Sequence, residues 1–111
     1  MKYMLLINTN PDARDVDLDV IHKGYQAFTE QILASGEMVA GDALEGTETA
    51  TTVRVRKGET TTTDGPFAET KETLAGYYVV DVPDLDRALA LAALIPDAQY
   101  GSIEVRPVRE M

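Results

Sequence analysis

Two stretches of the 111-residue sequence show the spacing of an amphipathic helix, and strand-like segments stand on both sides of each. They predict helices from about Val16 to Ser35 and from Leu85 to Ile95, with Asp15 or Asp17 as N-cap of the first and Asp84 of the second. The longer helix carries one apolar stripe with steps of three and four residues: Leu18, Ile21, Tyr25, Phe28 and Ile32. Each helix must therefore bury one face against the strands.

The segments around the helices alternate apolar and polar residues or are rich in β-branched residues, which is typical of strands. The predicted strands are Lys2–Asn8, Glu37–Leu44, Thr49–Lys57, Thr60–Thr63, Leu74–Val82 and Ser102–Arg109. The tight turn Lys57-Gly58-Glu59 joins the third and fourth into a hairpin, and Gly41 predicts an irregularity in the second. Without the hairpin the order is βαβ-βαβ, which predicts a ferredoxin-like α+β fold with both helices on one face of an antiparallel sheet.

The other face of this sheet has no third layer to cover it. The first strand is apolar on both faces, which predicts a central position. In a later strand Tyr78 and Val80 share one face and Tyr77 and Val79 the other, so both faces of the sheet carry apolar side chains. An apolar face of this kind has to be buried by another surface. We therefore predict a homodimer, with residues 1–111 forming one domain in each copy.

The composition limits the classes of function. The formal net charge is −9, which disfavours nucleic acids and membrane surfaces as partners, since both require basic residues. The sequence has no cysteine, only one histidine and no P-loop or dinucleotide-binding motif, so we predict neither a metal site nor a cofactor. No apolar run is long enough for a membrane span or a signal peptide, and we predict a cytoplasmic protein.

The densest run of unusual chemistry lies between the hairpin and the next strand, at residues 62–72. Asp64-Gly65-Pro66 is a turn in which the carboxylate can bond the backbone, glycine accepts positive φ and proline fixes φ. Phe67 follows, and then three charged residues, Glu69, Lys71 and Glu72. Asp64 is either a carboxylate held rigidly at a cavity or the residue that shapes this loop, and the charges are either ligand-binding groups or a solvated turn.

The sequence from Asp64 to Glu72, DGPFAETKE, resembles the motif of the DGPF-domain proteins, a branch of the YCII-related superfamily. The resemblance extends over most of the chain, through residues 1–7, 50–56, 75–85 and 101–108. It implies a ferredoxin-like fold that pairs into a dimeric α+β barrel. It also implies two possible roles, because DGPF-type proteins are often encoded beside extracytoplasmic-function sigma factors, whereas YCII-type relatives include proposed lyases and dehalogenases.

The candidate site residues come partly from this loop. Asp64 and Glu72 are the candidate catalytic residues, and Lys71, Tyr25, Phe67, Arg54 and His22 are the candidate ligand-binding residues. In YCII-type relatives with a proposed catalytic histidine, that histidine lies about eleven residues before the glycine that ends the first helix. Counting back from Gly36 gives Tyr25, so the resemblance places a phenol there and leaves His22 on the shoulder of the helix.

These observations support two hypotheses about function. The first is a small-molecule-binding or regulatory accessory domain linked to sigma-factor signalling. The second is an acid–base enzyme of the lyase or dehalogenase type, acting on a small anionic or aromatic substrate. The departure at Tyr25 favours the first hypothesis, whereas a cluster of Asp64, Lys71, Glu72 and Tyr25 in one cavity would favour the second.

Overall fold

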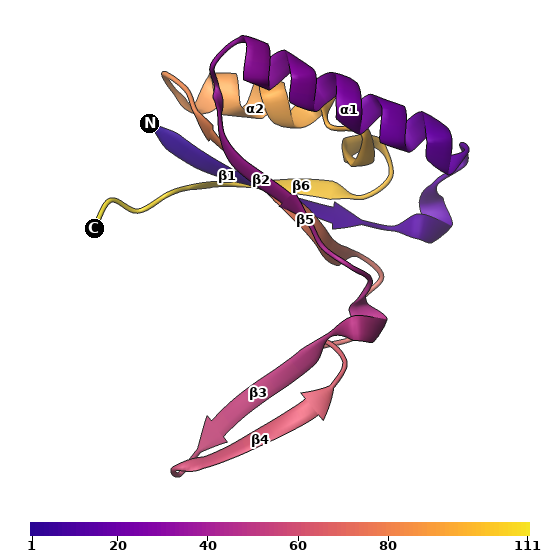
Figure 1. Cartoon of the computed structure of the whole chain (residues 1–111), viewed down its shortest axis with the longest axis vertical. Coiled ribbons are helices and arrows are strands. Elements are labelled where there is room, and N and C mark those ends of the chain that lie inside the picture. The colour runs from indigo at the N-terminus through magenta and orange to yellow at the C-terminus, as the bar shows by residue number, and fades with distance from the viewer.

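The computed structural model, which describes residues 1–111, has two helices on one face of a four-stranded antiparallel sheet (Figure 1). The elements are β1 (Lys2–Thr9), α1 (Leu18–Ala34), β2 (Met38–Ala43), β3 (Thr51–Arg56), β4 (Glu59–Asp64), β5 (Thr73–Asp81), α2 (Leu85–Leu94) and β6 (Ser102–Pro107). The strand order is β2-β5-β1-β6, and β3 and β4 form a separate two-stranded sheet. The predicted α+β class, the central position of β1 and the inserted hairpin are confirmed.

The core lies between the sheet and the helices, and its residues follow the predicted periodicities. Every second residue of β1 and β5 faces the helices, so that Leu5 and Val80 are fully buried. Ile32 of α1 and Leu91 of α2 are also fully buried. The rings of Phe28 and Tyr78 meet edge to face with their centroids 5.1 Å apart, which fixes α1 over β5.

The ends of the helices differ in detail from the prediction. Asp84 caps α2 as predicted, since its carboxylate accepts a hydrogen bond from the Arg87 N–H. Helix α1 begins at Leu18, two residues later than predicted, and Asp17 occupies its N-cap position without a side-chain hydrogen bond. Arg87 also forms a bidentate ion pair with Glu37, just after α1, and the hydrogen bonds from Arg87 and Ser35 lower the pKa of Glu37 to about 2.

The irregularity in β2 does not lie at the glycine. The pairing of β2 with β5 shifts between Met38 and Ala40, so the extra residue is Val39. Gly41 is required for a different reason, because a Cβ atom there would lie 2.8 Å from a ring carbon of Tyr78. Neither helix combines the length and the apolar composition that crossing a bilayer requires.

The β3–β4 hairpin extends away from the two layers (Figure 1). Its turn has positive φ at both Lys57 and Gly58, which suits the twist of a two-residue hairpin. All of β4 is exposed, and Val53 and Val55 of β3 are 59% and 57% exposed. The apolar side chains of this arm are therefore largely exposed. An isolated two-stranded hairpin of this kind is only marginally stable in water.

Candidate functional site

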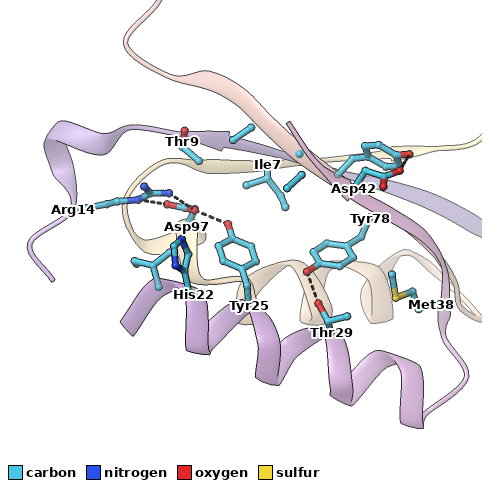
Figure 2. A pocket seen from close by; sticks show the side chains of 16 residues that line it. Ile7, Thr9, Arg14, His22, Tyr25, Thr29, Met38, Asp42, Tyr78 and Asp97 are labelled. Atoms are coloured by element: carbon cyan, nitrogen blue, oxygen red, sulfur yellow. Dashed lines mark hydrogen bonds and ion pairs between the residues drawn. The ribbon is translucent and has the colours of Figure 1, made fainter. Parts of the chain in front are cut away.

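A cavity of about 430 Å³ lies between α1 and the strands β2 and β5 (Figure 2). It is lined by Ile7, Thr9, Arg14, Ile21, His22, Tyr25, Thr29, Met38, Gly41, Asp42, Ala43, Ala75, Gly76, Tyr77, Tyr78 and Asp97. This volume lies within the range of about 300–1,000 Å³ typical of small-molecule sites. Half of the lining residues are hydrophobic, and the others provide a few converging polar groups.

A buried carboxylate forms one wall of the cavity. Asp97 lies in the 3₁₀ turn Pro96–Gln99, directly after α2, and its side chain is fully buried. Its Oδ1 accepts a hydrogen bond from Arg14 Nε at 2.9 Å, and its Oδ2 accepts one from Arg14 Nη2 at 2.8 Å. Oδ2 also accepts a hydrogen bond from the Tyr25 hydroxyl at 2.5 Å. The charge of Asp97 is therefore compensated by a bidentate arginine, as a buried carboxylate requires.

This network also sets the protonation of its members. Burial and the hydrogen bond to Asp97 raise the pKa of Tyr25 far above its ordinary value, so the phenol keeps its proton and acts as a donor. The hydrogen bond to Asp97 raises the pKa of Arg14, which remains a cation. Neither group is therefore available to accept a proton from a ligand.

His22 lies one turn before Tyr25 on the same side of α1. Figure 2 shows its ring pointing from the helix toward the Asp97 carboxylate. The residue is exposed, and its imidazole takes part in none of the side-chain hydrogen bonds of the chain. A histidine that lines a cavity without a hydrogen-bond partner is free to exchange a proton with a bound molecule.

Two adjacent tyrosines of β5 are among the lining residues, and their side chains project from opposite faces of the sheet, Tyr78 toward α1 and Tyr77 away from it. The Tyr77 hydroxyl donates to Asp42 Oδ2 at 2.8 Å, and this bond raises the pKa of Tyr77. The hydroxyls of Tyr78 and Thr29 are 2.7 Å apart. Gly76 faces β2 where a Cβ atom would lie 2.8 Å from the Asp42 carbonyl oxygen, so the two strands approach closely at this point.

The comparisons with known proteins agree with this architecture. The sequence model of the YCII-related domain matches residues 1–111. The chain belongs to the YCII-related family. An uncharacterised protein of Rhizobium meliloti (strain 1021) is 39% identical to this YCII-related chain over an alignment of 90 residues, and the match covers 79% of the chain and 73% of that protein.

Among solved structures, the YCII-related chain is similar to the 5-chloro-2-hydroxyhydroquinone dehydrochlorinase TftG from Burkholderia phenoliruptrix, in complex with 2,5-dihydroxybenzoquinone. The TM-score is 0.56, and the match covers 100% of this chain and 96% of TftG at 11% sequence identity. At this identity the likeness concerns the fold.

Two of the seven predicted site residues, His22 and Tyr25, line the cavity of this YCII-related protein. The other five, Asp64, Phe67, Lys71, Glu72 and Arg54, do not. The predicted cluster of Asp64, Lys71, Glu72 and Tyr25 is therefore not formed, because the loop of residues 65–72 lies at the base of the hairpin and not beside α1.

The first residues of the loop are tied to the start of β3 through Gly65. Gly65 has φ +106° and donates its N–H to the Ala50 carbonyl at 2.7 Å, while its own carbonyl accepts from Thr52 Oγ1. Asp64 is exposed, and its carboxylate accepts no hydrogen bond, so the predicted bond to its own turn is also absent. Phe67 is 80% exposed.

Two other predicted site residues have hydrogen-bond partners outside the cavity lining. Arg54 donates to the Phe67 carbonyl at 3.4 Å, and Glu72 accepts from Ser102 Oγ at 2.5 Å. A second hollow of about 360 Å³ borders the loop and includes Gly65, Pro66 and Glu69, but none of the seven predicted site residues.

Sequence reasoning missed Arg14, Asp42, Tyr77 and Asp97. Arg14 and Asp97 are 83 positions apart, and each stands in a short polar segment that reads as an ordinary loop. The one local signal was Asp97 directly after the proline that ends α2, in a segment otherwise poor in charge. Asp42 and Tyr77 are direct partners in the β2–β5 ladder, so their contact requires the strand register.

Proposed function

We propose that this chain binds a small, flat, hydroxylated ring compound in the cavity and catalyses proton transfer on it, with His22 as the acid–base group. The observation that carries this proposal is the Arg14–Asp97–Tyr25 network, which forms a rigid polar wall beside a histidine that has no hydrogen-bond partner. Tyr25 and Tyr78 border the same space, and flat rings pack well against aromatic side chains.

His22 is assigned because it is the one titratable residue of the cavity lining without a side-chain hydrogen bond in the chain. Asp42 and Tyr78, for example, bond Tyr77 and Thr29. Asp97 already accepts three hydrogen bonds and is paired with a cation, so its carboxylate is occupied by donors of the chain itself. Tyr25 and Tyr77 are held protonated by the carboxylates to which they donate. A positioned histidine accelerates a proton-transfer step by about 10²- to 10⁴-fold, which is enough for a slow but measurable enzymatic reaction.

Two reaction classes suit these groups of the cavity, elimination and tautomerisation. In both, the base removes a proton from the ring compound; in an elimination, a leaving group such as chloride departs with its electron pair. The similarity in fold to a dehydrochlorinase in complex with a dihydroxybenzoquinone supports this class without defining the substrate.

The experiment uses a panel of chlorinated and unchlorinated hydroquinones in D₂O. Binding is followed in H₂O by the amide shifts of Gly41 and Gly76, deuterium uptake in D₂O by proton NMR, and chloride release by ion chromatography. We expect His22→Asn to reduce turnover by about 100-fold or more while binding persists. The control is Lys23→Gln, which changes the next helix residue outside the cavity. Full turnover by His22→Asn would contradict the assignment.

Binding without turnover would favour the other hypothesis, a small-molecule-binding accessory domain. In that case the sigma-factor link implied by the resemblance of residues 64–72 to DGPF proteins becomes the role to test. The same motif is our basis for placing the chain in the DGPF branch of the family.

For the assembly we propose a homodimer in which the hairpin arm of one copy lies against the second copy. The support is physical: the side chains of Val53 and Val55 are more than half exposed, and Met4 and Leu6 on the open sheet face are only half-buried. Residues 51–64 carry three cations and two anions, a net charge of +1 in a chain of −9, so electrostatics favours contact between the arm and the rest of a second copy.

A further inference from the structure

The Arg14 guanidinium uses only one of its edges within the chain. Its Nε and Nη2 atoms donate to the two carboxylate oxygens of Asp97, at 2.9 and 2.8 Å. An arginine side chain has five N–H donors in one plane, so three remain after this pairing. Two of them, one on Nη1 and one on Nη2, point in parallel from the outer edge of the group. Arg14 thus keeps a second pair of donors that suits an acceptor oxygen.

This second edge of Arg14 is accessible. Arg14 is one of the residues that line the cavity, and its side chain is 17% exposed. No hydrogen bond of the chain involves Nη1, and every buried side-chain nitrogen and oxygen of the chain has a partner. Nη1 is therefore not buried, and its hydrogens are available to a molecule in the cavity.

The guanidinium is also held rigidly in this position. Arg14 follows the 3₁₀ turn Pro11–Ala13, and its backbone N–H donates to the Pro11 carbonyl at 3.2 Å. Asp97, which binds the other edge, is fully buried and also accepts the Tyr25 hydroxyl. A cation that is fixed before the ligand binds does not have to reorient when charge develops beside it, so it stabilises an anionic intermediate effectively.

A base and a fixed cation therefore lie at the same end of the cavity. Figure 2 shows Arg14, Asp97 and His22 together at this end. When a base removes the proton of a ring hydroxyl, the proton goes to the imidazole and the electron pair of the O–H bond stays on the oxygen. When the proton comes from a carbon next to a ring carbonyl, the negative charge appears on the carbonyl oxygen. In both cases a cationic N–H donor at that oxygen stabilises the anion.

We propose that the free edge of Arg14 binds the ring oxygen that becomes negatively charged when His22 removes the proton. This inference rests on the proposed function and makes it more specific. It selects compounds with an acidic ring hydroxyl, or with a carbonyl next to the reacting carbon, over ethers and alcohols. Tyr25, the other donor at this end, is already bonded to Asp97 and is not available to this oxygen.

The probe for this site is 4-nitrophenol, which ionises near neutral pH and absorbs visible light as the phenolate. Its binding to the full chain is followed by the amide shifts of Gly41 and Gly76. The absorbance of the bound probe is then recorded from about pH 5 to 8, where folded proteins are usually stable. Because a neighbouring cation favours the anionic form, we expect the phenolate to bind about tenfold or more tightly than the neutral phenol. The pKa of the bound probe should therefore lie about one unit or more below that of the free probe.

The test variant is the double substitution Arg14→Gln, Asp97→Asn, which replaces the ion pair by two amides and leaves the net charge of the chain unchanged. The matched control is Arg87→Gln, Glu37→Gln, which neutralises the other bidentate pair of the chain, outside the cavity lining. We expect the lowered pKa of the bound probe to return to the free value in the first variant and to persist in the second. It should also persist in His22→Asn, since the guanidinium remains.

The outcomes separate this inference from the proposed function. A bound probe with an unchanged pKa would overturn the role of Arg14 and leave the binding function intact, as would binding of hydroquinones without binding of 4-nitrophenol. A lowered pKa that survives in the Arg14–Asp97 variant, or that is lost in His22→Asn, would assign the phenolate to another group. If neither 4-nitrophenol nor any hydroquinone shifts the cavity amides, the proposed function fails and this inference fails with it.

A second variant covers the case in which the Arg14–Asp97 variant does not fold. Arg14→Lys keeps a cation for Asp97, but an ammonium group has no second edge with parallel donors. We expect this variant to lose about half or more of the lowering of the probe pKa. A lowering equal to that of the wild-type chain would overturn the role of the free edge.

Discussion

Tyr25 illustrates how one buried bond decides the chemistry of a side chain. Its hydroxyl is placed on Asp97 by its position on α1, and Asp97 accepts it together with the two Arg14 donors. The phenol is therefore a structural donor and a wall of the cavity, and the proton-transfer role that we propose is assigned to His22 instead. Both Tyr25 and His22 were predicted as site residues from the sequence. Asp97, whose hydrogen bond to Tyr25 distinguishes the two, is distant along the chain and was not predicted.

The first prediction concerns the pH dependence of stability. We expect Tyr25→Phe to lower the free energy of unfolding by about 1–2 kcal/mol at neutral pH, because Asp97 loses a buried donor. The pKa of Tyr25 is raised in the folded state, so its contribution is complete below the unfolded value near 10 and is lost as the pH rises toward the folded value. The gap between wild type and variant should therefore be constant from about pH 6 to 9 and shrink above about pH 10.

Urea unfolding at several pH values measures this gap directly. Tyr100→Phe is a suitable control, since Tyr100 lies outside the cavity and makes no side-chain hydrogen bond. A gap between wild type and Tyr25→Phe that stays constant up to pH 11 would contradict the role assigned to the Asp97 bond.

At the scale of elements, local patterns were sufficient for most of the fold. The spacing of the α1 stripe and the alternation in β1 and β5 each depend on residues a few positions apart, and both predicted the buried faces. The cavity is a different case, because Arg14 meets Asp97 only through the packing of segments distant in the sequence, and Asp42 meets Tyr77 only through the β2–β5 register. The loop of residues 64–72 was predicted to carry site residues because of its unusual composition, but its contacts lie outside the cavity.

The two helix starts give the second prediction. Asp84 accepts the Arg87 N–H, whereas Asp17 occupies the same position of α1 without such a bond. We expect Asp84→Ala to lower the free energy of unfolding by about 1 kcal/mol, the usual cost of losing an N-cap. Asp17→Ala should cost less than about 0.5 kcal/mol, since only its interaction with the helix dipole is lost. Urea titrations of both variants at one pH test the contrast, and equal losses would contradict the difference in capping.

At the scale of the whole molecule, the monomer leaves two apolar surfaces without partners: the open face of the sheet and the valine stripe of the hairpin arm. Burying both in one contact is possible if two copies exchange arms about a two-fold axis, because each copy then offers an arm and receives one. An arm that packs against another chain would also acquire the stability that an isolated hairpin lacks.

The third prediction is therefore a dimer that depends on this stripe. We expect the wild-type chain of 12.1 kDa to have twice that mass in solution, and the double variant Val53→Thr, Val55→Thr to be monomeric. Threonine keeps the β-branched shape that favours a strand but removes apolar area, so the arm itself should persist. Light scattering after size-exclusion chromatography measures the mass. The control pair Thr61→Ser, Thr63→Ser alters the opposite face of the hairpin and should remain dimeric. A monomeric wild type would refute the assembly, and a dimeric valine variant would place the contact elsewhere on the chain.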